Sequence, residues 1–252
     1  MVLFNSSLRA TNSASPTRSF SNEALALGGM LALASAMGIG RFVYTPILPT
    51  MADALGLTKF DAGLIASANF AGYLAGALLT ARTRLRGSQR AWLFGALVVG
   101  ALSTAGMGLG GSMTMLLLLR FVGGVASAFV LVLGSALVID RLSTAGRGRL
   151  AAVHFAGVGL GIAVSAALVD TLQAAGAGWR VLWLGCGAAA GIVIPIVASL
   201  VPDVTAGRAA SPIAPSRSPS KVPSLGRLSL CHGLFGGAGT LPRPTRSDPG
   251  HA

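Results

Sequence analysis

Charged residues are scarce in this chain, and acidic residues are the scarcest. Only 10% of its 252 residues are charged, with seven Asp and Glu against 19 Lys and Arg, while 53% are hydrophobic. A typical soluble domain carries about 25% charged residues. This composition excludes an ordinary water-soluble globular protein and predicts an integral membrane protein, in which 35 glycines favour closely packed helices.

Residues for metal binding, disulfide formation and ATP hydrolysis are also few. The three histidines are His154, His232 and His251, and the two cysteines, Cys186 and Cys231, lie in an apolar run and a polar tail. This distribution gives no metal-ligand cluster and no disulfide framework, so we expect no cofactor. The sequence also lacks a phosphate-binding loop and any Ser-His-Asp set compatible with a membrane, so we expect neither ATP-driven transport nor an enzyme.

The apolar residues fall into runs long enough to cross a membrane as helices, which takes about 20 residues. Residues 91–119 are uncharged but too long for one span, and Gly108–Ser112 supplies a turn. We predict an all-α membrane bundle in residues 24–201, with six spans at about 24–48, 62–81, 91–107, 113–139, 150–169 and 181–201.

The two ends of the chain are polar. We expect residues 1–23 and the Pro/Ser/Arg-rich residues 202–252 to be disordered. An organellar transit peptide is the weaker alternative for residues 1–23, because they are rich in Arg and Ser but show no amphipathic face.

Basic residues indicate the orientation of the bundle. The connections between spans two and three and between spans four and five are the most basic, with Arg82, Arg84, Arg86 and Arg90 in the first and Arg141, Arg147 and Arg149 in the second. Because basic loops face the cytoplasm, we expect both termini there. The net charge of +12 is then a topology signal for a protein whose partner is the lipid bilayer, and we expect no nucleic-acid partner.

An arginine interrupts the first span. Arg41 lies in the stretch GIGRFVYTPILP, residues 38–49, with two glycines before it and two prolines after it. A charge at that depth is costly and usually faces a bundle interior or a watery cavity. Loosened helices near polar residues are typical of transporter sites. The alternative is an arginine that extends to the membrane interface, with Tyr44 in an aromatic belt.

Other polar residues occupy the spans. Arg120 lies at a similar depth to Arg41, Asn69 and Tyr73 are four residues apart, and His154 lies about one turn inside the fifth span, where it could shuttle protons. Polar contacts between helices are the alternative for such side chains. Two arginines without an acidic residue inside any span favour an anionic small molecule. We predict a transport pathway lined by Arg41, Tyr44, Asn69, Tyr73, Arg120 and His154.

Several stretches together resemble a known family. Residues 119–128 (LRFVGGVASA) resemble the R-x-x-x-G-x-x-x-A signature in the fourth helix of major facilitator superfamily (MFS) transporters. Residues 38–49, 62–76 (AGLIASANFAGYLAG) and 154–161 (HFAGVGLG) are similar to YbfB/YjiJ-type MFS transporters. This resemblance covers about residues 24–201. It implies a secondary active, proton-coupled permease of the bacterial inner membrane, with an undefined substrate.

The chain departs from the superfamily pattern in two places. The arginine-rich loop after the second span lacks the aspartate of its signature, which puts the gating assigned to that loop in doubt. The fifth span lacks the Gly-Pro pair of the antiporter signature, so the resemblance does not extend to drug/proton antiport.

Six spans are equivalent to the N-terminal half of an MFS transporter. Residues 225–236 (LGRLSLCHGLFG) resemble the opening of a seventh helix, but the residues that follow cannot form a span. We expect a change of reading frame near Gly236, which would make this a truncated, inactive half. The alternatives are a half-transporter that forms a homodimer, a non-transporting membrane remnant and, more weakly, a small-molecule sensor.

Overall fold

The computed structural model describes residues 21–82 and 87–201, which form helices and short connections without a β-strand. The elements are α1 (Asn22–Leu33), the π-helix η1 (Ala34–Ile39), α2 (Tyr44–Leu55), α3 (Lys59–Arg82), α4 (Gln89–Met107), α5 (Met113–Thr144), the 3-10 helix η2 (Gly148–Leu150), α6 (Ala151–Ala174) and α7 (Trp179–Leu200). Six helical stretches are long and apolar enough to cross a membrane, with α1 to α2 forming one of them. The predicted six-span, all-α bundle is confirmed.

Side-chain caps determine where several helices begin. Ser21 and Ser112 each accept a hydrogen bond from the backbone N–H three residues further on, at 3.1 and 3.3 Å. Thr58 and Asp61 cap α3 reciprocally: the Asp61 carboxylate accepts the Thr58 N–H at 3.0 Å, and the Thr58 hydroxyl accepts the Asp61 N–H at 3.1 Å. These bonds satisfy N–H groups that a helix start leaves unpaired, so α3 begins at Lys59 rather than near residue 62.

The helices extend further than the expected spans. The helix α2 continues to Leu55 with Pro49 inside it and ends where Gly56 adopts a left-handed φ of 63°. The helix α5 continues to Thr144 rather than ending near residue 139, because charged residues end the apolar run without ending the helix. The helix α1 already includes Asn22 and Glu23. Residues 1–20 and 202–252 of the predicted disordered ends, and the expected change of frame near Gly236, lie outside the described residues.

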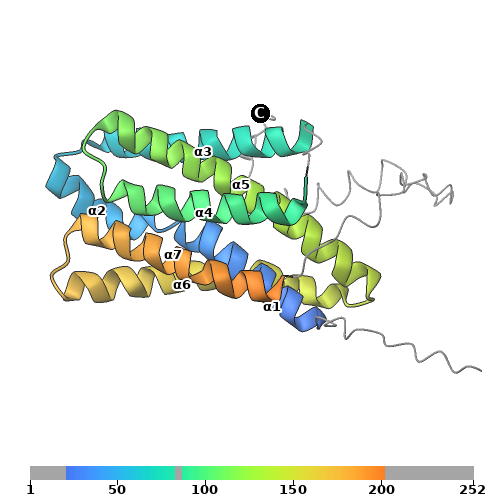
Figure 1. The fold of residues 1–252 in the computed structure, drawn as a ribbon. Helices are drawn as coiled ribbons and strands as arrows, with labels where there is room; N and C mark the ends of the chain where they lie inside the picture. Colours follow the sequence, from blue (N-terminus) through green and yellow to red (C-terminus); the bar gives the residue numbers. More distant parts are fainter. Residues whose placement is uncertain (1–20, 83–86, 202–252) are drawn as a thin grey trace, which may run out of the picture. The chain divides into compact units, whose positions relative to one another are not determined.

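Glycines allow the helices to approach closely. The contacts pair α3 with α5, α4 with α5 and α7, and α1 with α6, and Figure 1 shows α4 beside α5 and α6 beside α7. A Cβ added at Gly157 or Gly161 of α6 would collide with the carbonyl oxygen of Met30 or Ala34 on the first span. Small residues replace large side chains at such contacts because lipid provides no hydrophobic drive for helix association.

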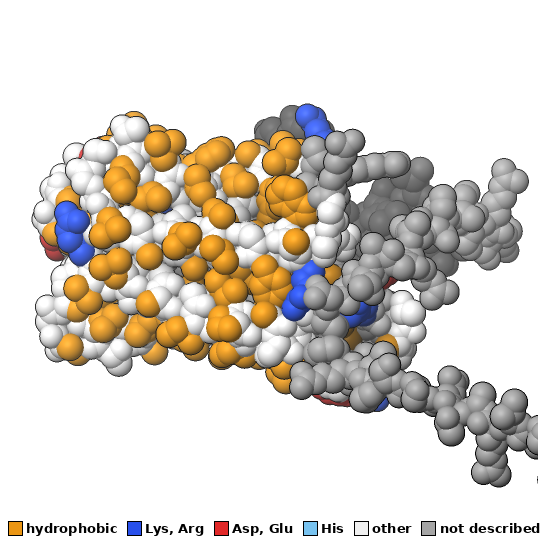
Figure 2. All heavy atoms as spheres, viewed as in Figure 1, with side chains coloured by type: hydrophobic (Ala, Val, Ile, Leu, Met, Phe, Trp, Pro, Cys, Tyr) orange, Lys and Arg blue, Asp and Glu red, His pale blue; other side chains and the backbone are white. Residues whose placement is uncertain are grey.

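The surface between the two ends of the bundle is apolar. On the face seen in Figure 2, hydrophobic side chains cover the helices, and Lys and Arg side chains lie near the ends. Leu102 and Ile192 are 66% and 68% exposed, an arrangement that water would disfavour but a bilayer favours. The protein is therefore embedded in the membrane as a multi-pass bundle.

Replacing Gly161 by alanine should destabilise the protein by about 1–3 kcal/mol, because the added methyl group would overpack the contact between α6 and the first span. Gly159 on the same helix has open space where a Cβ would lie. Gly159→Ala is the matched control and should be neutral or stabilising by up to about 1 kcal/mol. Thermal unfolding in detergent, followed by circular dichroism, measures both. Equal shifts in the two variants would contradict the close contact.

Candidate functional site at the break in the first span

The first span loses its regular α-helical hydrogen bonds between α1 and α2. The N–H groups of Gly40 and Phe42 bond to carbonyl oxygens five residues earlier, at 2.8 and 3.2 Å. Pro46 has no N–H to donate, and the N–H of Thr45 bonds to the carbonyl only three residues earlier, at 3.2 Å. This interruption coincides with the glycines and prolines around Arg41. It leaves backbone carbonyls at membrane depth that need other donors.

Arg120 of α5 supplies those donors. Its Nη1 donates to the carbonyl oxygen of Gly40 at 3.2 Å, and its Nη2 donates to that of Arg41 at 3.1 Å. The side chain is only 5% exposed. Its guanidinium carbon lies 5.0 Å from the centre of the Tyr44 ring and 5.9 Å from that of Trp183. Arg120 therefore caps the break and stacks against two aromatic rings.

Tyr44 and Asn69 connect the same region to α3. The Tyr44 hydroxyl donates to the carbonyl of Ala62 at 2.8 Å, and the ring is only 6% exposed. Tyr44 therefore lies inside the bundle rather than in an aromatic belt. Asn69 is 2% exposed, and its Nδ2 donates to the carbonyl of Arg120 at 3.0 Å. Asn69 makes the polar contact between helices that the sequence left as an alternative.

Arg41 has a different environment from Arg120. Its guanidinium carbon lies 4.2 Å from the ring centre of Tyr73, 4.7 Å from that of Phe70 and 5.9 Å from that of Phe42. The side chain is half-buried. Among the described residues, no hydrogen bond or ion pair reaches the guanidinium of Arg41. The guanidinium of Arg41 therefore contacts neighbouring aromatic rings, and its N–H groups have no hydrogen-bond partner among the described residues.

His154 is not part of this group. It lies on α6, is fully buried, and its Nε2 is 3.1 Å from the hydroxyl oxygen of Ser135 on α5. Its ring makes an edge contact with Phe155 at 5.0 Å and fits against Gly29 of α1, where a Cβ would collide with the imidazole. These contacts are those of a packed side chain between three helices.

The arginines between spans two and three also differ in their surroundings. Arg82 is exposed at the end of α3, and Arg84 and Arg86 lie outside the described residues. The Nη2 of Arg90 donates to the carbonyl oxygen of Ala198 on α7 at 2.9 Å. Arg90 therefore joins α4 to α7 in addition to its place in a basic connection.

Sequence reasoning missed three aromatic residues at the break: Phe42, Phe70 and Trp183. Phe70 precedes Tyr73 by three residues on one helix, a spacing that could have indicated a shared face. Trp183 is fully buried in α7, and its indole N–H has no hydrogen-bond partner among the described residues. No local signal in its apolar run indicates that it faces Arg120.

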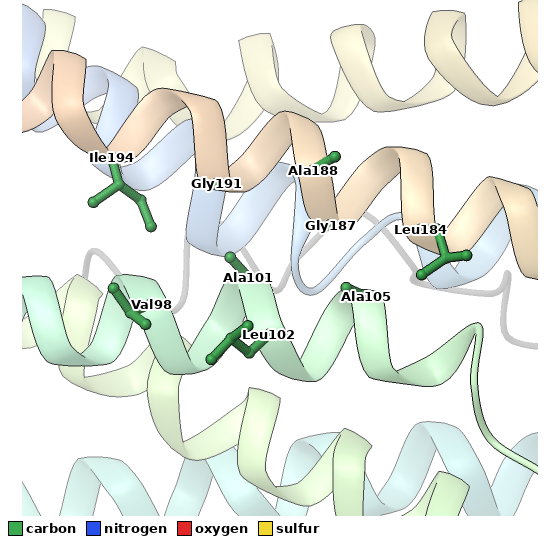
Figure 3. A pocket seen from close by; sticks show the side chains of 9 residues that line it. All are labelled: Val98, Ala101, Leu102, Ala105, Leu184, Gly187, Ala188, Gly191 and Ile194. Carbon is green, nitrogen blue, oxygen red and sulfur yellow. The ribbon is translucent and has the colours of Figure 1, made fainter.

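A separate groove lies between α4 and α7, with a cavity volume of about 500 Å³ (Figure 3). The side chains that line it are all apolar and include those of Leu102, Ala105, Leu184 and Ile194. A ligand site needs a few placed polar groups to fix orientation, and this groove offers none. The described residues also contain no group of three or more His, Cys, Asp or Glu side chains that could hold a metal. The break at Arg41 is therefore the better candidate site.

Comparisons with known proteins identify the family of the chain. A protein-family model described as "Uncharacterised MFS-type transporter YbfB" matches residues 33–242. The chain belongs to this family. A comparison with curated proteins gives no match. Membership in the YbfB-type MFS family makes the protein a transporter by class.

Replacing Arg120 by methionine should lower the free energy of unfolding by about 1–3 kcal/mol for each backbone carbonyl left unpaired. Arg120→Lys should recover only part of this loss. The ammonium group keeps a charged donor, but it lacks the two parallel N–H groups with which the guanidinium reaches both carbonyls. Thermal unfolding in detergent measures the effect. The exposed arginine variant Arg82→Gln is the control and should unfold like the wild type. An unchanged midpoint in Arg120→Met would exclude the capping role.

Proposed function

We propose that this protein is a secondary active transporter that couples the movement of a small molecule to a proton gradient, with the break at Arg41 in its pathway. The observation that carries the proposal is a half-buried cation inside a span, beside irregular backbone and without a counter-charge among the described residues. Irregular backbone at membrane depth occurs where it is buried in protein or lines a water-filled cavity. Transporters build their binding sites from such broken helices.

The residues around the break would have different tasks. Arg41 and Tyr73 would contact the transported molecule, because both are partly exposed and Arg41 carries a charge. Arg120, Tyr44 and Asn69 would hold the backbone of the break, which supports the proposal by keeping Arg41 in one place. Proton coupling follows from the superfamily resemblance. His154 stays a predicted proton-shuttling residue, although its packed surroundings favour a structural task.

We further propose that a second six-span half completes the pathway, as a missing C-terminal half or a second copy of this chain. In the most apolar part of the spans Lys59–Arg82 and Gly148–Ala174, only 22% and 28% of the residues are buried, against 67% for the first span. The large exposed surface of these two spans supports the proposal that a second half packs against them. A non-transporting membrane remnant is the alternative. The mass of the purified protein in detergent separates a homodimer from a monomer.

The location we propose is the bacterial inner membrane, with both termini in the cytoplasm. Ser88 and Gly111 are exposed at opposite ends of α4. In a cysteine-free background, Ser88→Cys should react with a thiol reagent only from the cytoplasmic side, and Gly111→Cys only from the periplasmic side. Labelling of intact cells and inverted vesicles measures both. The reverse pattern would overturn the orientation.

Transport can be tested in vesicles that contain the purified protein and a pH-sensitive dye. A panel of small organic anions, cations and sugars should include at least one solute that changes the internal pH. Arg41→Gln should reduce this signal by about tenfold or more, because removing a buried ligand contact costs at least about 1.4 kcal/mol. Arg82→Gln should keep the signal. If Arg41→Gln transports as well as the wild type, Arg41 is not in the pathway.

A further inference from the structure

We infer that the break binds a monocarboxylate with a flat apolar body, and that Arg41 is the residue that recognises the carboxylate. The inference rests on the proposed function and adds the chemical class of the ligand. Three features of the site carry it: the number of available cations, the N–H groups of Arg41 that have no hydrogen-bond partner among the described residues, and the aromatic rings beside them.

Only one of the two arginines is available to a ligand. The guanidinium of Arg120 is buried and already donates to the carbonyls of Gly40 and Arg41. That of Arg41 is half-buried and makes no hydrogen bond among the described residues. The sequence suggested that both arginines could bind an anion, but the geometry leaves one. One cation favours a ligand with a single negative charge.

The acidic residues of the described chain do not neutralise Arg41. They lie near the helix ends, at Glu23, Asp53, Asp61, Asp140 and Asp170, and none forms an ion pair with Arg41. The ion pair that Glu23 forms is with Arg147, at 3.1 Å. An uncompensated cation at membrane depth is unfavourable. An anion from solution would compensate it, which is why we assign a negative charge to the ligand.

The chemistry of the Arg41 guanidinium favours a carboxylate. Its guanidinium lies over the rings of Tyr73 and Phe70, at 4.2 and 4.7 Å from their centres. Guanidinium N–H groups lie in the plane of the group and match the two oxygens of a carboxylate. A phosphate accepts similar bonds but carries up to two charges near neutral pH. A second negative charge would have no partner here, so the carboxylate fits better.

The rings beside Arg41 favour a flat apolar ligand body. Phe70 is 60% exposed and Phe42 is 38% exposed, and both lie next to the guanidinium. Exposed aromatic faces stack well on aromatic or other flat apolar groups. A ligand with a carboxylate at one end and a ring at the other has a partner for each group here, the guanidinium of Arg41 and the neighbouring ring of Phe70.

The test uses benzoate, its neutral amide benzamide, acetate and inorganic phosphate as probes of the purified full chain in detergent. Titration calorimetry should show benzoate binding about tenfold or more tightly than each of the other three. Arg41→Gln should weaken benzoate binding by about tenfold or more, because it removes the positive charge. Arg41→Lys should weaken it less, because it keeps the charge and loses only the paired N–H donors of the guanidinium. Phe70→Leu should weaken benzoate binding about threefold or more and leave acetate binding unchanged.

The matched control is Arg82→Gln, which removes an exposed arginine at the end of α3, the helix that also carries Phe70. This variant should bind benzoate as the wild type does. Thermal unfolding of each variant shows that it is folded. Equal binding of benzamide and benzoate, tighter binding of phosphate, or no benzoate binding by folded wild-type protein would each overturn the carboxylate assignment. Benzoate binding without any uptake in vesicles would support the site while contradicting the transport function.

Discussion

The pair of hydrogen bonds from Arg120 to the first span is the interaction on which the rest of the site depends. Inside a bilayer no water can satisfy a backbone carbonyl, so an interrupted helix must find donors within the protein. The guanidinium of Arg120 reaches the two adjacent carbonyls of Gly40 and Arg41 at once. Asn69 in turn donates to the backbone carbonyl of Arg120. The break, α5 and α3 are therefore held by one connected set of polar contacts.

This arrangement separates the tasks of two similar residues. Arg120 stabilises backbone geometry, and its charge is sheltered by the rings of Tyr44 and Trp183. Arg41 contributes its carbonyl to that network and its side chain to a different surface, beside Phe70 and Tyr73. A fixed carbonyl fixes the Cα of the same residue, so the network also positions the Arg41 side chain. A site held in this way needs little reorganisation when a ligand arrives.

Close helix packing makes these short polar contacts reachable. Gly124 of α5 faces the backbone at Asn69, and Gly72 of α3 faces the backbone at Phe121, so no side chain separates the two helices there. Because the two helices lie this close together, the short side chain of Asn69 on α3 can reach a backbone carbonyl of α5. The glycine content that marks the chain as a membrane protein thus also determines which polar groups meet. The apolar groove between α4 and α7 lies outside this network and has no polar group to contribute.

The sequence by itself determined the membrane class, the six spans and the weak point in the first one. Span length and the positions of glycine and proline act locally, so they can be recognised without a fold. The cap formed by Thr58 and Asp61 is also local and was overlooked. The tertiary structure alone decided that Arg120 caps the break, that Trp183 lies beside it and that His154 is packed elsewhere. Arg120 and Gly40 are 80 residues apart, and no periodicity within one helix can show which side chain of another will face it.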